Sequence, residues 1–186
     1  MNKFWIIVLV AVVVTLGGLA LRSFAAKVPS MPQVGQTAPG FTLPNQEGQP
    51  VSLTSQRGKW VVLYFYPKDM SYGCSIEAHN FQRDIEKYHA ANAVILGVSL
   101  DTVKSHKKFC TKDGLGFTLL SDHKAQVSRD YGVLGNYMGF KIDHRVTFLI
   151  NPQGNIVKVW RKVSPSGHSE QVLAELKEAI NKDKWT

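Results

Sequence analysis

The sequence is poor in cysteine: only Cys74 and Cys110 occur among its 186 residues. Two thiols are too few for a four-cysteine zinc site or for a scaffold held by many disulfides, although they leave one disulfide possible. Only 19% of the residues are charged and 44% are hydrophobic, and the chain has no internal repeat and no low-complexity tract. This composition excludes a disordered or collagen-like protein and predicts a single globular domain.

The first 26 residues lack acidic side chains, and Lys3 and Arg22 are the only charged side chains among them. The run from Phe4 to Leu21 is uncharged over 18 residues. As a helix it would span about 27 Å, close to the hydrocarbon core of a bilayer at about 30 Å. Lys3 precedes the run as in a signal sequence, and the small residues of Ser23-Phe24-Ala25 offer a cleavage site.

These features predict that residues 1–26 form a signal anchor or a cleaved signal peptide. Residues 27–34 are then a tether and residues 35–182 a folded body. Both alternatives export the body to the periplasm or an equivalent compartment, and the anchor attaches it to the membrane through residues 4–21. Because an oxidising compartment favours disulfides, a static bond between the two cysteines remains an alternative to chemistry at the thiols.

Strand and helix patterns alternate through the body. The apolar run from Trp60 to Tyr66 (WVVLYFY) is typical of a buried central strand. The other predicted strands are 41–43, 51–53, 94–100, 117–120, 146–150 and 156–160, and the predicted helices are 75–90, 103–112, 125–131 and 170–181. This order, which closes with a hairpin and a helix, predicts an α/β three-layer sandwich with a central sheet flanked by helices.

Cys74 lies where the central strand gives way to a helix. The strand ends at Pro67 and the helix begins near Cys74, so the thiol lies in or just before the first helical turn, at the carboxyl edge of the sheet. Unpaired backbone N–H groups and the helix dipole favour a thiolate there. Ser71 can offer a hydroxyl to the sulfur or to a substrate. On this pattern alone, a reactive nucleophile and a buried structural thiol are equal alternatives.

The segment around Cys74 resembles the active-site signature of peroxiredoxins, Pro-x-x-x-(Thr/Ser)-x-x-Cys, which Pro67, Ser71 and Cys74 satisfy. The wider sequence is similar to the peroxiredoxin Q branch, also called bacterioferritin comigratory protein. The similar segments are Tyr64-Phe65-Tyr66-Pro67-Lys68-Asp69, Gly73-Cys74-Ser75-x-Glu77-Ala78, 35–41, 114–122 and 145–150. The resemblance implies a thioredoxin-like fold and a thiol-dependent peroxidase that reduces hydrogen peroxide and organic hydroperoxides without a cofactor or a metal ion.

The resemblance also implies roles for individual residues. Cys74 would be the peroxidatic cysteine, which a hydroperoxide oxidises to a sulfenic acid. Pro67 would shield the pocket, and Ser71 would hydrogen-bond the peroxide at a position where the family usually has threonine. Arg145 would supply a planar, permanently charged guanidinium to the thiolate and to the developing oxyanion. Glu77 is expected either to fix Arg145 or to complement the dipole of its own helix.

Two residues depart from the pattern of the branch. Tyr72 replaces the usual proline and is expected to change the shape of the pocket. His79 stands where many members carry a second cysteine, and an imidazole cannot resolve a sulfenic acid.

Cys110 lies in the predicted helix 103–112, where another subclass of the branch has its resolving cysteine. The resemblance therefore implies an intramolecular disulfide between Cys74 and Cys110, recycled by thioredoxin or a similar dithiol. A static disulfide and an idle buried thiol are the alternatives. A disulfide needs Cβ atoms about 3.5–4.5 Å apart. We expect the reduced cysteines to lie farther apart than this, so that local unwinding precedes bond formation.

Other functions fit the sequence less well. An exported thiol–disulfide oxidoreductase normally has Cys-x-x-Cys, but Glu77 occupies the position of the second cysteine. A metal-binding protein needs paired ligands, whereas the six histidines are scattered and only His144 is expected near the pocket. Nucleic-acid binding is not expected because the positive charge is spread over several segments, and the lysines of the helix 103–112 are predicted to form a solvated face. The resemblance implies a monomer.

Overall fold

The fold is that of a computed structural model, which describes residues 30–183. The predicted signal or anchor, residues 1–26, and its membrane segment, residues 4–21, lie outside the described residues. Within residues 30–183, no helix is both long enough and apolar enough to cross a membrane.

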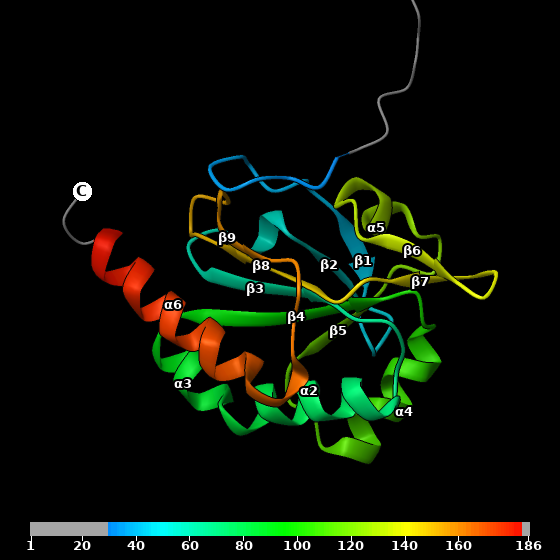
Figure 1. Cartoon of the computed structure of the whole chain (residues 1–186). Helices are drawn as coiled ribbons and strands as arrows, with labels where there is room; N and C mark the ends of the chain where they lie inside the picture. Colours follow the sequence, from blue (N-terminus) through cyan, green and yellow to red (C-terminus); the bar gives the residue numbers. More distant parts are fainter. Residues whose placement is uncertain (1–29, 184–186) are drawn as a thin grey trace, which may run out of the picture.

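A five-stranded mixed sheet forms the centre of the domain, with the strand order β5-β4-β3-β8-β9 (Figure 1). Its strands are β3 (Trp60–Phe65), β4 (Ala93–Ser99), β5 (Thr118–Ser121), β8 (Val146–Ile150) and β9 (Ile156–Trp160). The strands β3, β4 and β5 are parallel, β8 is antiparallel to β3, and β9 is antiparallel to β8. Helices make the crossovers that the parallel neighbours require.

Helices cover one face of this sheet, as Figure 1 shows. They are α2 (Tyr72–Arg83), α3 (Ile85–Ala90), α4 (Val103–Asp113) and α6 (His168–Asp183). The opposite face carries α5 (Gln126–Asp130) and the hairpin of β1 (Thr42–Pro44) and β2 (Pro50–Ser52), while η1 (Thr54–Gln56) and η2 (Pro165–Gly167) are short 3-10 turns. The predicted central sheet flanked by helices is therefore confirmed.

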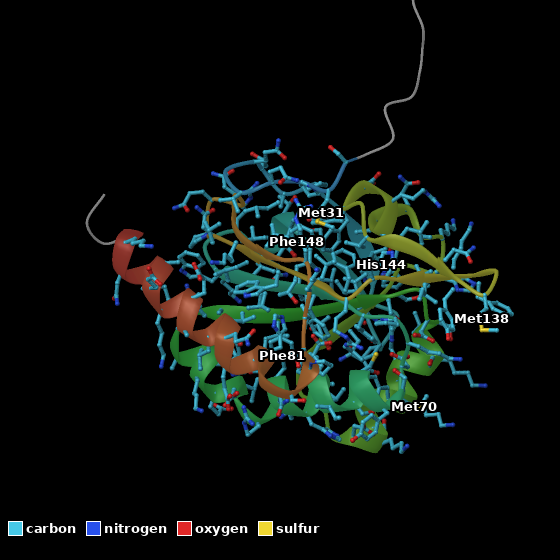
Figure 2. All side chains as sticks on the ribbon, in the orientation of Figure 1. Met31, Met70, Phe81, Met138, His144 and Phe148 are labelled. Carbon is cyan, nitrogen blue, oxygen red and sulfur yellow. The ribbon has the colours of Figure 1, made fainter. Side chains whose placement is uncertain are left out.

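The central strand β3 separates two hydrophobic cores, because successive side chains of a strand point to opposite faces. Val62 and Tyr64 pack with Phe81 beneath the helices, whereas Leu63 packs with Phe148 on the other side. Figure 2 labels Phe81 and Phe148, which lie on opposite sides of the sheet. Every residue of β3 is buried, which explains why the predicted strand is apolar without alternation.

The prediction of a single helix over 75–90 is wrong, because this segment forms two helices, α2 and α3. The break falls at Asp84, whose buried carboxylate accepts hydrogen bonds from Lys87 Nζ at 2.8 Å and from Ser169 Oγ at 2.9 Å. The apolar pattern continues across the break because both helices pack on the same core. Nothing in the local spacing therefore indicates where α2 ends.

A second hairpin, β6 (Leu134–Tyr137) and β7 (Phe140–Asp143), was not predicted from the sequence. Its tip is exposed, so it lacks the buried alternating positions that mark a strand. The hairpin projects from the body in Figure 1 and leads directly into the segment that carries Arg145.

Candidate active site

Cys74 lies in the first turn of α2, directly after the loop that leaves β3. Ser71 is the N-cap residue and has an extended backbone (φ −75°, ψ 149°), and the helix begins at Tyr72. The Cys74 side chain is buried, with 2% of its surface exposed. This end of a helix presents unpaired N–H groups and the positive end of the dipole, so it favours an anion.

Arg145 contacts Cys74 from the position just before the neighbouring strand β8. Because Phe65 pairs with Val146 in the antiparallel β3–β8 ladder, the start of β8 lies beside the end of β3. Arg145, one residue before β8, therefore reaches the loop that follows β3. Its Nη2 donates a hydrogen bond to Cys74 Sγ at 3.2 Å.

The second arm of the same guanidinium binds Glu77. Arg145 Nη1 donates to Glu77 Oε2, and the two residues form an ion pair. Glu77 follows Cys74 by three residues, so both side chains lie on one face of α2. One arginine thus bridges the sulfur and a buried carboxylate, a task that suits its planar fork.

Gly73 gives Arg145 room to pass. A Cβ atom on residue 73 would lie 3.4 Å from Arg145 Nη2 and 3.7 Å from Pro165 Cγ. The contact with Pro165 is an ordinary one, whereas the contact with Nη2 is at the tight limit, so a side chain here would press on the guanidinium.

Burial affects the two members of the Arg145–Glu77 pair differently. Burial raises the pKa of Glu77 from 4.5 to about 7, and the nearby Arg145 only partly offsets this shift. Partial burial lowers the pKa of Arg145, but Glu77 and the Cys74 sulfur outweigh it, so this pKa rises above its usual value. The difference arises because Glu77 is fully buried and its Oε1 has no hydrogen-bond partner, whereas the Arg145 side chain is 16% exposed.

Pro67 and Ser71 lie in the loop between β3 and α2, and both are half-buried. The Ser71 hydroxyl donates to the Lys68 carbonyl at 3.0 Å and makes no side-chain cap to the helix. The structure thus brings Arg145 into contact with both Cys74 and Glu77, while Ser71 bonds within its own loop.

Cys110 lies in α4, which matches the predicted helix to within one residue. It belongs to the same buried core as Cys74, and both cysteines are free thiols. Burial, together with the negative charges of Asp69 and Glu47, raises the pKa of the Cys110 thiol to about 11.

A buried polar cluster beside the site was missed from the sequence. Asp69 accepts hydrogen bonds from the Tyr66 hydroxyl at 2.7 Å and from His106 Nδ1 at 2.9 Å. No local spacing marks this cluster in the sequence, because Asp69 and His106 lie 37 residues apart. His144, expected near the pocket, is exposed, and a Cβ atom on Gly135 would lie 2.5 Å from its Nε2. Its imidazole therefore packs over β6 (Figure 2).

Within residues 30–183, the structure contains no metal-binding group of three or more histidine, cysteine, aspartate or glutamate side chains.

Comparisons with known proteins give the class of the chain. A model of the AhpC/TSA family matches residues 34–159. The putative peroxiredoxin bcp of Coxiella burnetii is 46% identical over 148 residues, which cover 77% of this chain and 98% of that protein. The peroxiredoxin Bcp of Escherichia coli K12 is 39% identical over 150 residues, covering 78% of this chain and 96% of that protein.

Solved structures agree with these relatives. A cysteine-to-serine mutant of Xylella fastidiosa PrxQ superposes with a TM-score of 0.77 at 36% identity, covering 81% of this chain and 99% of that one. The Xanthomonas campestris bacterioferritin comigratory protein, whose alkyl peroxide reduction activity was studied in trapped intermediate and ligand complexes, superposes with a TM-score of 0.70 at 39% identity. This match covers 75% of this chain and 91% of that one.

The fold and these relatives define a thioredoxin-like, thiol-dependent peroxidase. The chain belongs to the peroxiredoxin Bcp/PrxQ group of the AhpC/TSA family. The resemblance to peroxiredoxin Q seen in the sequence is thereby confirmed.

Proposed function

We propose that Cys74 is the nucleophile of the peroxidase and that Arg145 activates it. The observation that carries this proposal is the 3.2 Å contact from Arg145 Nη2 to Cys74 Sγ. The thiolate attacks the distal oxygen of a hydroperoxide, so that an S–O bond forms and the O–O bond breaks. The remaining oxygen takes a proton and leaves as an alcohol or as water, and Cys74 becomes a sulfenic acid.

The neighbouring residues support this step in different ways. Arg145 stabilises the negative charge that develops on the leaving oxygen, because its charge is held in place before the reaction begins. Glu77 positions Arg145 by holding its second arm. Pro67 shields the thiolate, and Ser71 turns from the Lys68 carbonyl to hydrogen-bond the bound peroxide.

We assign the resolving role to Cys110. Its sulfur attacks the sulfur of the Cys74 sulfenic acid, an S–S bond forms, the S–O bond breaks and water leaves. The support is that both free thiols belong to one buried core and that the sequence contains no third cysteine. Because both are buried within helices, disulfide formation requires local unwinding around Cys74, around Cys110 or around both.

A dithiol of the thioredoxin type restores the enzyme by thiol–disulfide exchange. The complete reaction converts a hydroperoxide and a reduced dithiol into an alcohol, water and a disulfide. Hydrogen peroxide and organic hydroperoxides are the proposed substrates, and the alkyl peroxide reduction studied in the Xanthomonas campestris relative supports the organic class. Tyr72 is 86% exposed and is the first residue of α2, two residues before Cys74, so it is the residue to vary when substrate preference is tested. The proposed enzyme acts as a monomer.

A peroxidase assay coupled to thioredoxin and its reductase tests the two cysteines in the full chain. Cys74→Ser should consume no peroxide. Cys110→Ser should give one turnover and then stop, and a small thiol should restore its turnover. The wild type should shift on a non-reducing gel when peroxide is added and shift back with thioredoxin. Turnover by Cys74→Ser, or a disulfide that persists while no peroxide is consumed, would contradict the proposal.

We also propose that residues 1–26 export the domain, either as a retained anchor or as a cleaved signal. The support is the 18-residue uncharged run from Phe4 to Leu21. Cell fractionation of the full chain, with the mass of the recovered protein, distinguishes the two forms. A full-length chain in the membrane fraction indicates the anchor, and a shortened chain in the periplasm indicates the signal. A full-length chain in the cytosolic fraction would contradict both.

A further inference from the structure

The tip of the β6–β7 hairpin carries exposed apolar side chains. Five large hydrophobic side chains are exposed in the described part of the chain, and three of them belong to this tip. Tyr137 is 65% exposed, Met138 81% and Phe140 74%. Tyr137 pairs with Phe140 across the hairpin, so the two rings lie on one face. Figure 2 shows Met138 at the outer end of the hairpin, away from the body of the domain. A contiguous apolar cluster on a protein surface marks an interaction site.

The turn at this tip keeps an apolar side chain where the backbone does not favour one. Met138 (φ 50°) and Gly139 (φ 86°) form a two-residue turn with positive φ at both positions, where asparagine and glycine are the usual residues. Asn136 Oδ1 closes the turn by accepting a hydrogen bond from the Gly139 N–H at 2.9 Å. Methionine thus occupies an unfavourable conformation without burying its side chain in the domain. Such an outlier points to a contact outside the chain.

The size and shape of the tip fit a lipid bilayer better than a folded partner. At about 150–250 Å² for a whole aromatic side chain, three side chains exposed to this degree offer roughly 400 Å². A stable protein–protein interface needs about 800 Å² from each partner. The hairpin projects from the body in Figure 1, so a flat partner that contacted the tip would contact little else. In a bilayer, by contrast, an apolar surface of any outline is buried once it enters the boundary between headgroups and acyl chains.

The residues of the tip are also those that favour a membrane interface. Tyrosine is enriched at the level of the headgroups because its ring is apolar and its hydroxyl is polar. Lys141 is exposed directly after Phe140, and a lysine keeps its charged end in water while its stem covers apolar surface. From residue 132 to residue 142 the chain contains no acidic side chain, and Asp143, at the end of β7, is fully buried. The hairpin therefore presents a positive charge and no exposed negative charge to an anionic lipid surface.

The chain that precedes the described residues enters the domain at the base of this hairpin. A Cβ atom on Gly132, two residues before β6, would lie 2.6 Å from the Met31 backbone nitrogen. The uncharged run ends at Leu21, and the eight residues from 22 to 29 span at most about 29 Å. Each four-residue strand of the hairpin is about 13 Å long. A membrane that held the uncharged run would therefore lie within reach of the tip.

We propose that the tip, residues 137–141, docks on the surface of a lipid bilayer and presents the active site to hydroperoxides in the lipid. This inference rests on the proposed peroxidase function and names the phase from which the site takes organic hydroperoxides. Arg145 follows the end of β7 by two residues, and its Nη2 contacts Cys74 Sγ at 3.2 Å. Because the site adjoins the base of the hairpin, a docked tip keeps it close to the headgroups. A polar hydroperoxide group is unfavourable in hydrocarbon, so an oxidised acyl chain exposes it at that level. Cys74 takes the distal oxygen, and the lipid keeps the other as an alcohol.

Hydrogen–deuterium exchange of the full chain tests docking directly, with and without vesicles of phosphatidylcholine and phosphatidylglycerol. Exchange of the backbone amides of residues 134–143 reports on the hairpin alone, whichever form residues 1–26 take. Vesicles should slow this exchange in the wild type but not in the double variant Met138→Ser/Phe140→Ser. Both side chains are exposed, so the variant should keep the core intact.

Coupled peroxidase rates test the presentation of the site. The rate with a phospholipid hydroperoxide in the vesicles is compared with the rate with hydrogen peroxide in water. The double variant should keep its rate with hydrogen peroxide within about twofold and lose about tenfold with the lipid substrate, because burial of one such side chain is worth about tenfold or more in affinity for an apolar phase.

Val34→Ser is the matched control, because Val34 is 58% exposed and lies beside β9, where the Gly35 N–H donates to the Ile156 carbonyl at 2.8 Å. Its exchange and both of its rates should equal those of the wild type. Exchange of the wild-type tip that vesicles leave unchanged would overturn the inference, as would equal protection in the double variant.

Other occupants and the proposed function give different results. Protection that appears without vesicles and grows with protein concentration would identify a second copy of the chain at the tip and would overturn docking on lipid. An unchanged ratio of the two rates in the double variant would overturn the presenting role. Failure of the peroxidase proposal is recognised separately, because the wild type would then reduce neither substrate while its exchange still reports on docking.

Discussion

Glu77 places a charge in the domain core beside the reactive cysteine, at a cost to stability. Its side chain is fully buried and only one of its carboxylate oxygens has a partner. Burial raises its pKa from 4.5 to about 7 despite the ion pair with Arg145. This difference corresponds to about 3 kcal/mol in favour of the neutral acid over the carboxylate. Since glutamine has nearly the shape of the neutral acid, Glu77→Gln should remove this cost.

The pH dependence follows from where the proton is bound. Below pH 4.5, Glu77 is protonated in the folded and in the unfolded chain, so wild type and variant should be equally stable. Between pH 4.5 and 7 the unfolded chain releases this proton while the folded chain keeps it, so the wild type loses stability as the pH rises. Above pH 7 the variant should be more stable by about 3 kcal/mol.

Urea unfolding of the full chains at a series of pH values measures this difference. Glu170→Gln is the matched control, because Glu170 is an exposed carboxylate paired with Arg83 and should change stability by at most about 1 kcal/mol. The same Glu77→Gln chain should react with peroxide more slowly, by up to about 100-fold, because Arg145 loses the charge that holds its second arm. A stability difference that does not vary with pH, or that favours the wild type at pH 8, would refute the reasoning.

Three further substitutions test the site and the core beneath it. Arg145→Lys should lower the rate with peroxide by about 100-fold or more, because a single ammonium cannot bridge the sulfur and the carboxylate; a rate near wild type in a stopped-flow assay would argue against the guanidinium. Phe81→Ala should cost about 3–5 kcal/mol in urea unfolding, since Phe81 is fully buried against the Tyr64 ring at 4.9 Å between centroids; a loss below 1 kcal/mol would mean that the core closes over the gap. Gly97→Ala should cost about 1–3 kcal/mol, because its Cβ would lie 2.7 Å from both Tyr64 and Leu119, and an unchanged unfolding midpoint would contradict the tight contact.

Much of the fold was predictable because its signals are local. The strand predicted over 146–150 is β8 and the one over 156–160 is β9, residue for residue. The helix predicted over 103–112 is α4, with one residue more. These segments follow the apolar runs and helical spacing that burial imposes on a short stretch of chain.

The errors fall at two places that the apolar pattern of the sequence does not mark. At the helix break, the buried Asp84 carboxylate bonds Arg83 and Lys87 close in sequence and Ser169, which lies 85 residues farther along the chain. The hairpin of β6 and β7 pairs two strands whose side chains are largely exposed, so no buried face marks it in the sequence. In both cases the apolar pattern is uninformative because the decisive interactions are polar or involve the backbone.

The candidate site also contains features that the sequence predicted and features that it did not. The position of Cys74 at the start of a helix follows from a strand that ends at Pro67 and a helical pattern that begins a few residues later. That Arg145 would bind Glu77 was one of two expectations, and its contact with Cys74 was implied only by resemblance. The pairing of Asp69 with His106 was not anticipated at all.

By itself, the sequence determined where strands and helices form, that the chain holds a single pair of thiols, and that one of them begins a helix after a buried strand. Only the tertiary structure decided which side chains meet that thiol. Arg145 lies 71 residues from Cys74 and reaches it because β8 pairs with β3. His106 lies 37 residues from Asp69 and reaches it because α4 packs on the same face as α2. Hydrophobic burial drives the chain to collapse but is non-directional, so strand pairing and helix packing select the polar partners.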